Sequence, residues 1–199
     1  LSGLGGESIV GLDARPADGT FYALTGTGKL YAINGETGAA TVVSTLSADP
    51  ADATSPFTGL AGTDVGMDFN PVVDRLRVTT STGQNLRINV DTGATITDTA
   101  INGLSTGYGA IAYSNSVGPA CRTTLYAFDV ATNRFLSQNP PNDGVANGIG
   151  GLGSDPTASG GFDVATDAAG VNTGVALLTV GGATAFYTID LGSGAATSN

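Results

Sequence analysis

The chain has 199 residues, of which 31 are Gly and only 12% are charged, and its formal net charge is −10. An acidic chain with seven Lys and Arg residues is repelled by nucleic-acid phosphates and by anionic lipid surfaces, which argues against nucleic acid as a partner. The chain has no run of eighteen apolar residues that would predict membrane insertion, and it has no histidine, the commonest general base and zinc ligand.

Strands rich in small residues recur along the chain, and each opens one copy of a repeated unit. Gly and Ala at these positions would let the innermost strands of a propeller lie close together around a central channel. We therefore predict innermost strands at Val10–Asp13 (VGLD), Val65–Asp68 (VGMD), Ala110–Tyr113 (AIAY) and Gly161–Val164 (GFDV). Second strands are predicted at Thr20–Thr25, Arg75–Thr79 and Val175–Val180.

The third strand of each copy is predicted to begin a segment that alternates apolar and polar residues, turns at Gly or Asn, and continues as a further strand. Such alternation around a turn is typical of an antiparallel hairpin, since Gly and Asn tolerate positive φ. These segments are Leu30–Val43, Leu86–Asp98, Leu125–Gln138 and Phe186–Asn199. The third copy is the least regular of the four.

Together these elements predict an all-β protein, a small β-propeller of about four blades, each a four-stranded antiparallel sheet. We expect one domain over residues 1–199, with blades near residues 9–46, 64–100, 108–152 and 160–199. A β-sandwich is the alternative that strand spacing alone leaves open. Residues 1–7 make a poor strand and residues 195–199 a very short one, so we expect an incomplete last blade, whose free edge another chain could pair with.

Several segments carry a specific resemblance to a known family. They are VGMDFNPVVDRLRVTTSTGQNLRINVDTG over Val65–Gly93, LSQNPPNDG over Leu136–Gly144, GESIVGLDARPADGTFYAL over Gly6–Leu24 and FYTIDLGSGAAT over Phe186–Thr197. In these segments the chain resembles the bacterial exported domain-of-unknown-function family 4394. The resemblance extends over nearly the whole chain. The resemblance implies a secreted or cell-surface protein, and it implies no established activity or site.

Three aspartates, Asp13, Asp68 and Asp163, recur at equivalent ends of the predicted innermost strands, and the third copy has Tyr113 at this place. One interpretation is structural: each carboxylate accepts backbone N–H groups of the turn that follows it. Because three carboxylates near a channel mouth also supply the oxygen ligands that calcium prefers, a calcium site is the second interpretation. A pair of these carboxylates could instead serve a glycosidase.

An arginine-rich hairpin is the most distinctive cluster of the chain, and its candidate ligand-binding residues are Arg75, Arg77, Gln84, Asn85 and Arg87. The parity of the three arginines places them on one face of a sheet, where they could pair with acids across strands. The alternative is a pocket that binds a carboxylate or a sugar. The loop Asn139–Gly144 (NPPNDG) is either a contact on the rim of such a site or a plain connector.

The lone Cys121 excludes an internal disulfide, and we expect it to be buried or half-buried, or else paired between molecules. Without histidine or a recognisable catalytic motif, we expect a non-enzymatic extracellular structural or binding module. Its partners would be copies of itself or other cell-surface components, and an open edge strand would let it assemble into a filament or surface layer. The alternatives are a carbohydrate-binding propeller and a carbohydrate-active lyase or glycosidase.

Overall fold

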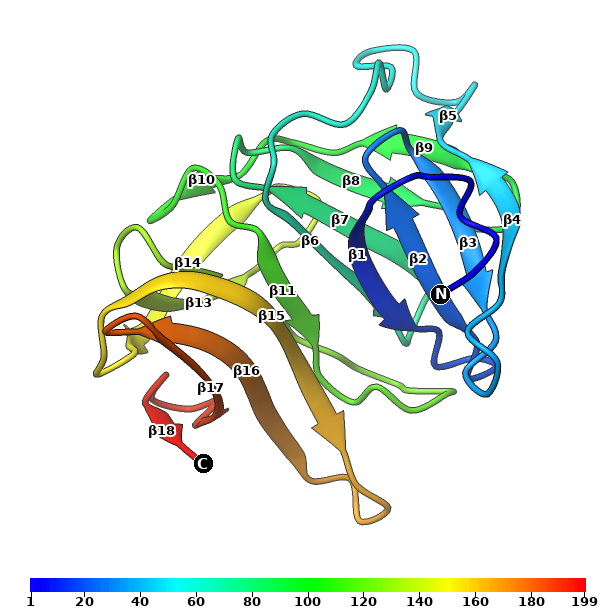
Figure 1. Cartoon of the computed structure of the whole chain (residues 1–199). Coiled ribbons are helices and arrows are strands. Elements are labelled where there is room, and N and C mark those ends of the chain that lie inside the picture. The colour runs from blue at the N-terminus through cyan, green and yellow to red at the C-terminus, as the bar shows by residue number, and fades with distance from the viewer.

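The fold is all-β, as predicted, and its strands form four sheets around a common centre (Figure 1). It is seen in a computed structural model that describes residues 1–199, apart from the side chains of Ala158 and Ser159. No helix of the described chain is long and apolar enough to cross a membrane. The prediction of a four-bladed β-propeller is therefore confirmed, and we number the blades 1 to 4 in chain order.

Each blade consists of four strands in which sequence neighbours pair antiparallel. Blade 1 contains β1 (Ile9–Ala14), β2 (Phe21–Thr25), β3 (Lys29–Ile33) and β4 (Ala40–Thr45). Blade 2 contains β6 (Val65–Asn70), β7 (Arg75–Thr80), β8 (Asn85–Ile88) and β9 (Ala94–Thr97). Blade 3 contains β11 (Ala110–Tyr113), β12 (Leu125–Asp129), β13 (Arg134–Gln138) and β14 (Val145–Gly151). Blade 4 contains β15 (Pro156–Thr166), β16 (Asn172–Val180), β17 (Ala183–Ile189) and β18 (Ala196–Ser198).

The innermost strands are β1, β6, β11 and β15, which contain the four segments predicted for this position. β6 packs against both β1 and β11, and β11 also packs against β15. Gly66 shows why small residues are needed there, because a Cβ atom at this position would lie 3.0 Å from the backbone nitrogen of Ala110. Even an alanine would force β6 and β11 apart.

The same five-residue turn joins neighbouring strands within each of the four blades. It joins the third and fourth strands at Asn34–Gly38, Asn89–Gly93 and Asp190–Gly194, but in blade 3 it joins the second and third strands at Asp129–Asn133. The first side chain accepts backbone N–H groups of the turn, as Asn34 Oδ1 does from Glu36 at 3.0 Å. The last residue has positive φ, 69° at Gly38 and 55° at Asn133.

This turn explains an error in the predicted strand order. The segment Leu125–Gln138 holds the second and third strands of blade 3, β12 and β13, and not the third and fourth. The turn needs only its own side chains and backbone, so it can close any antiparallel pair. Its sequence pattern therefore marks a hairpin without saying which hairpin of the blade it is.

Short connecting segments run along the outermost strand of the blade that follows them. β5 (Ser47–Ala48) pairs in parallel with β9, and β10 (Asn102–Gly103) pairs in parallel with β14. At the corresponding place on blade 4, the backbone N–H of Ala196 donates to the carbonyl of Leu152 at 2.9 Å. On blade 1 this place is taken by Ser2, which forms an isolated bridge with Ala39.

Blade 4 has its own fourth strand, although that strand is short. β18 pairs with Tyr187–Ile189 of β17, so the outer edge of β17 from Ala183 to Ala185 has no strand beside it among the described pairings. The predicted incompleteness of the last blade is thus limited to Ala183–Ala185 of β17, whose outer edge has no neighbour among the described pairings. The strand itself is present.

The ring of blades is open between blade 4 and blade 1. One buried cluster joins side chains of blades 1 and 2, such as Tyr22 and Phe69, and another joins blades 3 and 4, where the rings of Phe128 and Phe162 lie 4.5 Å apart. Among the described residues, no core cluster combines side chains of blades 1 and 4. The interface between blades 4 and 1 therefore lacks a shared core cluster of the kind that joins blades 1 and 2 and blades 3 and 4.

Candidate functional site

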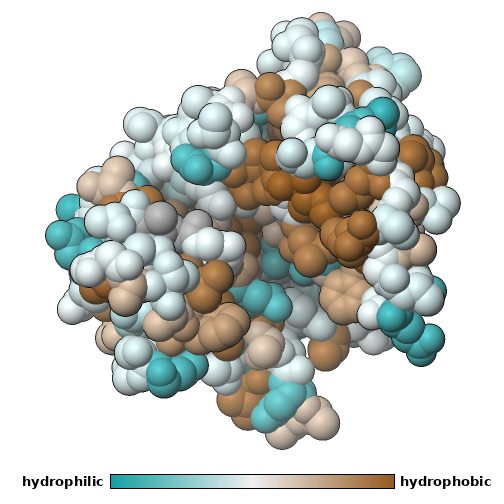
Figure 2. All heavy atoms as spheres, viewed as in Figure 1, coloured by the Kyte–Doolittle hydropathy of each residue, from teal (hydrophilic) through white to brown (hydrophobic). Residues whose placement is uncertain are grey.

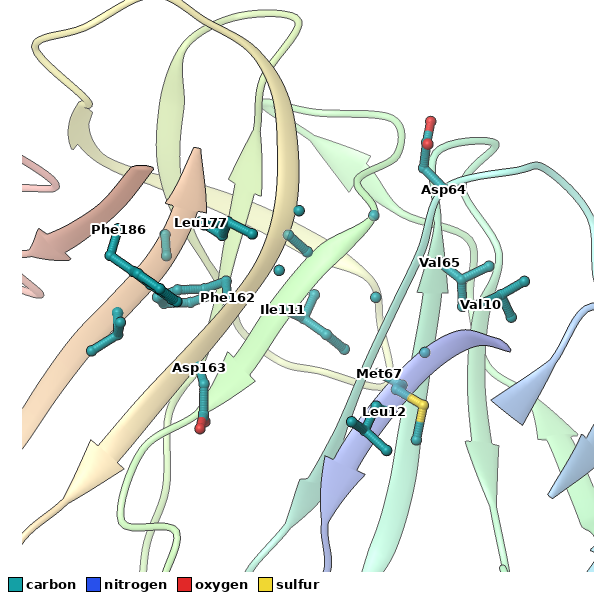
Figure 3. Close-up of a pocket in the computed structure, with 18 of the residues that line it drawn as sticks. Val10, Leu12, Asp64, Val65, Met67, Ile111, Phe162, Asp163, Leu177 and Phe186 are labelled. Carbon is teal, nitrogen blue, oxygen red and sulfur yellow. The ribbon is translucent and has the colours of Figure 1, made fainter. Parts of the chain in front are cut away.

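A cleft of about 730 Å³ occupies the centre of the propeller and opens between blades 1 and 4. Figure 3 shows its two flanks: Val10, Leu12 and Met67 lie on one side, and Phe162, Leu177 and Phe186 lie on the other. Ile111 of β11 lies between them. Figure 2 shows apolar atoms gathered beside the hollow near the middle of this face.

Large apolar side chains are exposed on both flanks of the cleft. Leu12 of β1 is 56% exposed and Phe186 of β17 is 60% exposed. Val10, at a β-bulge of β1, is partly buried against the core of blades 1 and 2, so Leu12 is the exposed apolar side chain of this strand. Apolar side chains that face each other across an open cleft are typical of an interaction surface, since their burial removes apolar area from water.

The three predicted aspartates meet beside this cleft. One carboxylate oxygen from each of Asp13, Asp68 and Asp163 lies within 4.8 Å of the other two, although the residues belong to β1, β6 and β15. The geometry therefore brings together the set that the sequence singled out. Asp163 is exposed, Asp13 is half-buried and Asp68 is only 3% exposed.

Backbone N–H groups occupy several of these carboxylate oxygens. Asp13 accepts from Ala14 (2.7 Å) at Oδ1 and from Phe69 (2.7 Å) at Oδ2. Asp68 Oδ1 accepts from Tyr113 at 3.0 Å. For Asp13 and Asp68 these donors belong to their own strand or to the next blade, so the two side chains link blades 1, 2 and 3. The predicted bond to the segment that follows is present at Asp13, which accepts from Ala14, but the prediction was wrong for Asp68, whose acceptor bond goes to the next blade.

The burial of this cluster favours protonated carboxyl groups. The pKa of Asp13 is raised to about 7, chiefly by burial and also by the nearby Asp163, against the lowering effect of the Phe69 and Ala14 N–H groups. Burial also raises the pKa of Asp68 well above its ordinary value, and Asp13 adds to this effect. The cluster can thus hold protons that isolated aspartates would lose.

The position equivalent to Asp13 and Asp68 in blade 3 is Ala112, and the prediction that it is Tyr113 was wrong. Phe69, which follows Asp68, donates to Asp13, and Tyr113, which follows Ala112, donates to Asp68. The hydrogen bonds between blades therefore align Asp68 with Ala112, whereas the sequence comparison aligned Asp68 with Tyr113, one residue further along. Calcium binding stays a prediction, and its candidate acidic ligands among the described residues are these three carboxylates.

The arginine-rich hairpin folds around a buried ion pair. Arg77, which is 3% exposed, donates from Nη1 to Asp98 Oδ2 at 2.7 Å and to Asn85 Oδ1 at 2.8 Å. Arg87 donates from Nη2 to Asp98 Oδ1 at 2.9 Å and from Nε to the other oxygen. Arg77 and Arg87 lie opposite each other on β7 and β8. The shared carboxylate offsets the repulsion between the two guanidinium groups.

The five predicted ligand residues do not all line one pocket. Arg75, Arg77 and Arg87 line a pocket between blades 2 and 3. Asn85 is fully buried behind it, where its amide donates to the carbonyls of Thr99 and Pro141. Gln84 turns away and holds the segment before β6, donating to the carbonyl of Gly59 and accepting from Ala61, both at 2.8 Å.

Sequence reasoning overlooked Asp98, the acid that pairs with Arg77 and Arg87, and Tyr113, which lines the pocket together with the NPPNDG loop. Asp98 follows β9, Tyr113 ends β11, and residues 140–143 belong to the NPPNDG loop. Only the loop carried a signal, as a possible rim contact. Arg77 Nη2 donates to Asn142 Oδ1 at 2.6 Å, which joins the loop of blade 3 to the sheet of blade 2.

Cys121 lies in the connection between β11 and β12 and is exposed, so the prediction that it is buried or half-buried was wrong. That connection runs over the surface, where backbone groups can reach water. Pairing of this exposed thiol between molecules stays a prediction.

A family model described as "Domain of unknown function (DUF4394)" matches residues 1–199. No curated protein matches the chain.

Proposed function

We propose that this chain, which belongs to the DUF4394 family, is a non-enzymatic structural and binding module that associates with copies of itself through the open side of its propeller. The observation that carries the proposal is the unclosed interface between blades 1 and 4. Its two apolar flanks, marked by the exposed side chains of Leu12 and Phe186, face water at the place where the other blades are packed. Covering this surface would be favourable.

The proposed occupant is a strand of a second copy. Phe186 lies on β17, and the part of β17 without an outer neighbour, Ala183–Ala185, directly precedes it. A strand laid there would gain backbone hydrogen bonds from the free edge and apolar contact from the cleft. A second copy supplies such a strand, because Ala183–Ala185 of its own β17 has the same free outer edge among the described pairings.

The charge of the chain sets the conditions for association. Each copy carries a formal net charge of −10, so copies repel one another at low ionic strength. Salt screens this repulsion and leaves apolar burial intact. Association should therefore strengthen with added NaCl, unlike association driven by ion pairs.

We place this module outside the cell, as a secreted or surface protein that joins copies of itself or other surface components. The placement rests on the resemblance to an exported family and on the acidic, Gly-rich composition.

A carbohydrate-active enzyme is the second candidate, and the raised pKa values of Asp13 and Asp68 beside the cleft favour it. Against it, both oxygens of Asp13 and one of Asp68 already accept backbone N–H groups. Turnover of a polysaccharide that is lost in Asp163→Asn, with the fold retained, would replace our proposal.

The test is light scattering of the purified chain over a range of protein and salt concentrations. We expect the mean mass to rise with both variables in the wild type, and the double variant Leu12→Ser/Phe186→Ser to stay monomeric. The control is Val171→Ser, which removes an apolar side chain of similar exposure, 57%, outside the residues that line the cleft. A wild type that remains monomeric throughout would overturn the proposal.

A further inference from the structure

A second pocket, of about 580 Å³, lies between blades 2 and 3. Its walls come from the β6–β7 turn, from the arginines of β7 and β8, from Tyr113 of β11, and from the loop Pro140–Asp143. The pocket is separate from the cleft described above, since the two have no lining residue in common. Its volume falls in the range of small-molecule sites.

Positive charge is concentrated at this pocket. Arg75, Arg77 and Arg87 line it, and they are three of only seven Lys and Arg residues in the chain. Asp98 neutralises part of this charge and Asp143 lies on the wall. In a chain whose formal net charge is −10, such a site stands out as a place that would attract an anion.

Donor groups remain unused in the wall of the pocket. Within the described residues, two buried atoms there have no hydrogen-bond partner: Nε of Arg77 and the hydroxyl of Tyr113. Among the described bonds, Nη1 of Arg87 and Nε and Nη2 of Arg75 are also without an acceptor. Buried donors without partners are costly, and a ligand that supplies acceptors would remove part of that cost.

The wall also offers groups suited to hydroxyls. Asn70 and Asn142 contribute amides and Asp143 contributes a carboxylate, whereas Val73 and Pro141 form small apolar surfaces. Arginine recognises carboxylates through paired N–H groups, and amides and carboxylates both bind sugar hydroxyls. A carboxylate alone would leave most of this volume and most of these groups unused.

We infer that the pocket between blades 2 and 3 binds a single uronic acid, with the carboxylate of the sugar at Arg75 and Arg87 and its hydroxyls at the loop Pro140–Asp143. This inference does not depend on self-association, because its residues lie outside the cleft between blades 1 and 4. It adds a ligand class to the proposed structural and binding role.

The test is a titration of the intact chain with galacturonate, followed by isothermal calorimetry. Galactose is the matched sugar without a carboxylate, and acetate is the carboxylate without a sugar. We expect saturable binding of galacturonate at one site per chain, and binding of galactose and acetate that is at least about tenfold weaker. Absence of saturable galacturonate binding, or equal binding of acetate, would overturn the inference.

Three variants locate the binding site. Arg87→Gln should weaken galacturonate binding by about tenfold, and Tyr113→Phe, which removes only the unpaired hydroxyl, by about threefold. Arg134→Gln is the control, because it makes the same change of charge at an exposed arginine of β13 that does not line the pocket. The melting temperature of each variant shows that it folds. If Arg134→Gln weakened binding as much as Arg87→Gln, the attraction would be non-specific and the inference would fail.

Discussion

The carboxylate of Asp13 on blade 1 accepts a hydrogen bond from the backbone N–H of Phe69 on blade 2, and the distance between Oδ2 and the nitrogen is 2.7 Å. Asp68 repeats this relationship one blade further on, where it accepts from Tyr113 of blade 3 at 3.0 Å. The series stops at Ala112, which has no carboxylate to offer. Two of the blade interfaces are thus joined by an aspartate side chain, and the interface of blades 1 and 2 also shares a buried apolar cluster.

Removing the Asp68 side chain should destabilise the protein. In Asp68→Ala the buried N–H of Tyr113 loses its acceptor, so we expect the free energy of unfolding to fall by about 1–3 kcal/mol. Asp68→Asn keeps an oxygen acceptor and should cost less than about 1 kcal/mol, because the carboxyl group is already favoured in its neutral form. Urea denaturation of both variants measures the difference. Equal losses in the two variants would contradict the assigned role of the hydrogen bond.

Stability should fall as pH rises from about 4.5 to 7. The pKa of Asp13 is raised to about 7 in the folded chain, from an ordinary value of 3.8. Between these values the folded state holds a proton that the unfolded state has lost, so each increase in pH favours unfolding until the folded carboxyl also ionises. Several other carboxyls, such as Asp74 beside Arg15, have lowered pKa values, and their effect lies below this window.

The measurement is the melting temperature from pH 4.5 to 9 at constant ionic strength, in the wild type and in Asp13→Asn. The wild type should lose about 2 kcal/mol over the window, a figure reduced for the partial exposure of the side chain, and the variant should lose clearly less. A wild-type stability that rises between pH 5 and 7 would contradict the prediction.

Calcium should change stability little. Four of the carboxylate oxygens in the cluster already accept backbone N–H groups, and burial raises the pKa values of Asp13 and Asp68, which favours protons over negative charge. At pH 7.5 we expect the melting temperature in millimolar calcium to lie within about 1 °C of its value in EDTA. Magnesium serves as the control for ionic effects. An increase of several degrees that is specific to calcium would establish the alternative of a calcium site.

A side chain at Gly66 should disrupt the interface between blades 2 and 3. Its Cβ would lie 3.0 Å from the backbone of β11, and backbone atoms cannot move aside as a flexible side chain can. We expect Gly66→Val to lower the free energy of unfolding by about 3 kcal/mol, as overpacking of a core does. Gly26→Ala is the control, because the nearest atom to its Cβ would be a side-chain carbon of Val10 at 3.6 Å. Equal stabilities of the two variants would show that β6 and β11 can separate freely.

Local chemistry explains what could be predicted from the residues alone. Small residues at Val65–Asp68 and alternation in the following strands predicted innermost and paired strands, because both patterns depend on neighbours within a few residues. The turn residues also act locally: Asn34 bonds its own turn, and Gly38 adopts the positive φ that closes it. The all-β class and the four-bladed propeller followed from the repetition of these units.

Contacts between distant residues decided the rest. The order of strands in blade 3, the equivalence of Ala112 with Asp68, and the pairing of Arg77 with Asn142 all depend on segments that meet only in the folded chain. A turn pattern cannot specify which two strands it joins, and a side chain such as Gln84 carries no mark of the direction in which it points. The open side between blades 1 and 4 is likewise a property of how four similar units close around an axis, which is set by packing between units and is absent from the sequence of any one of them.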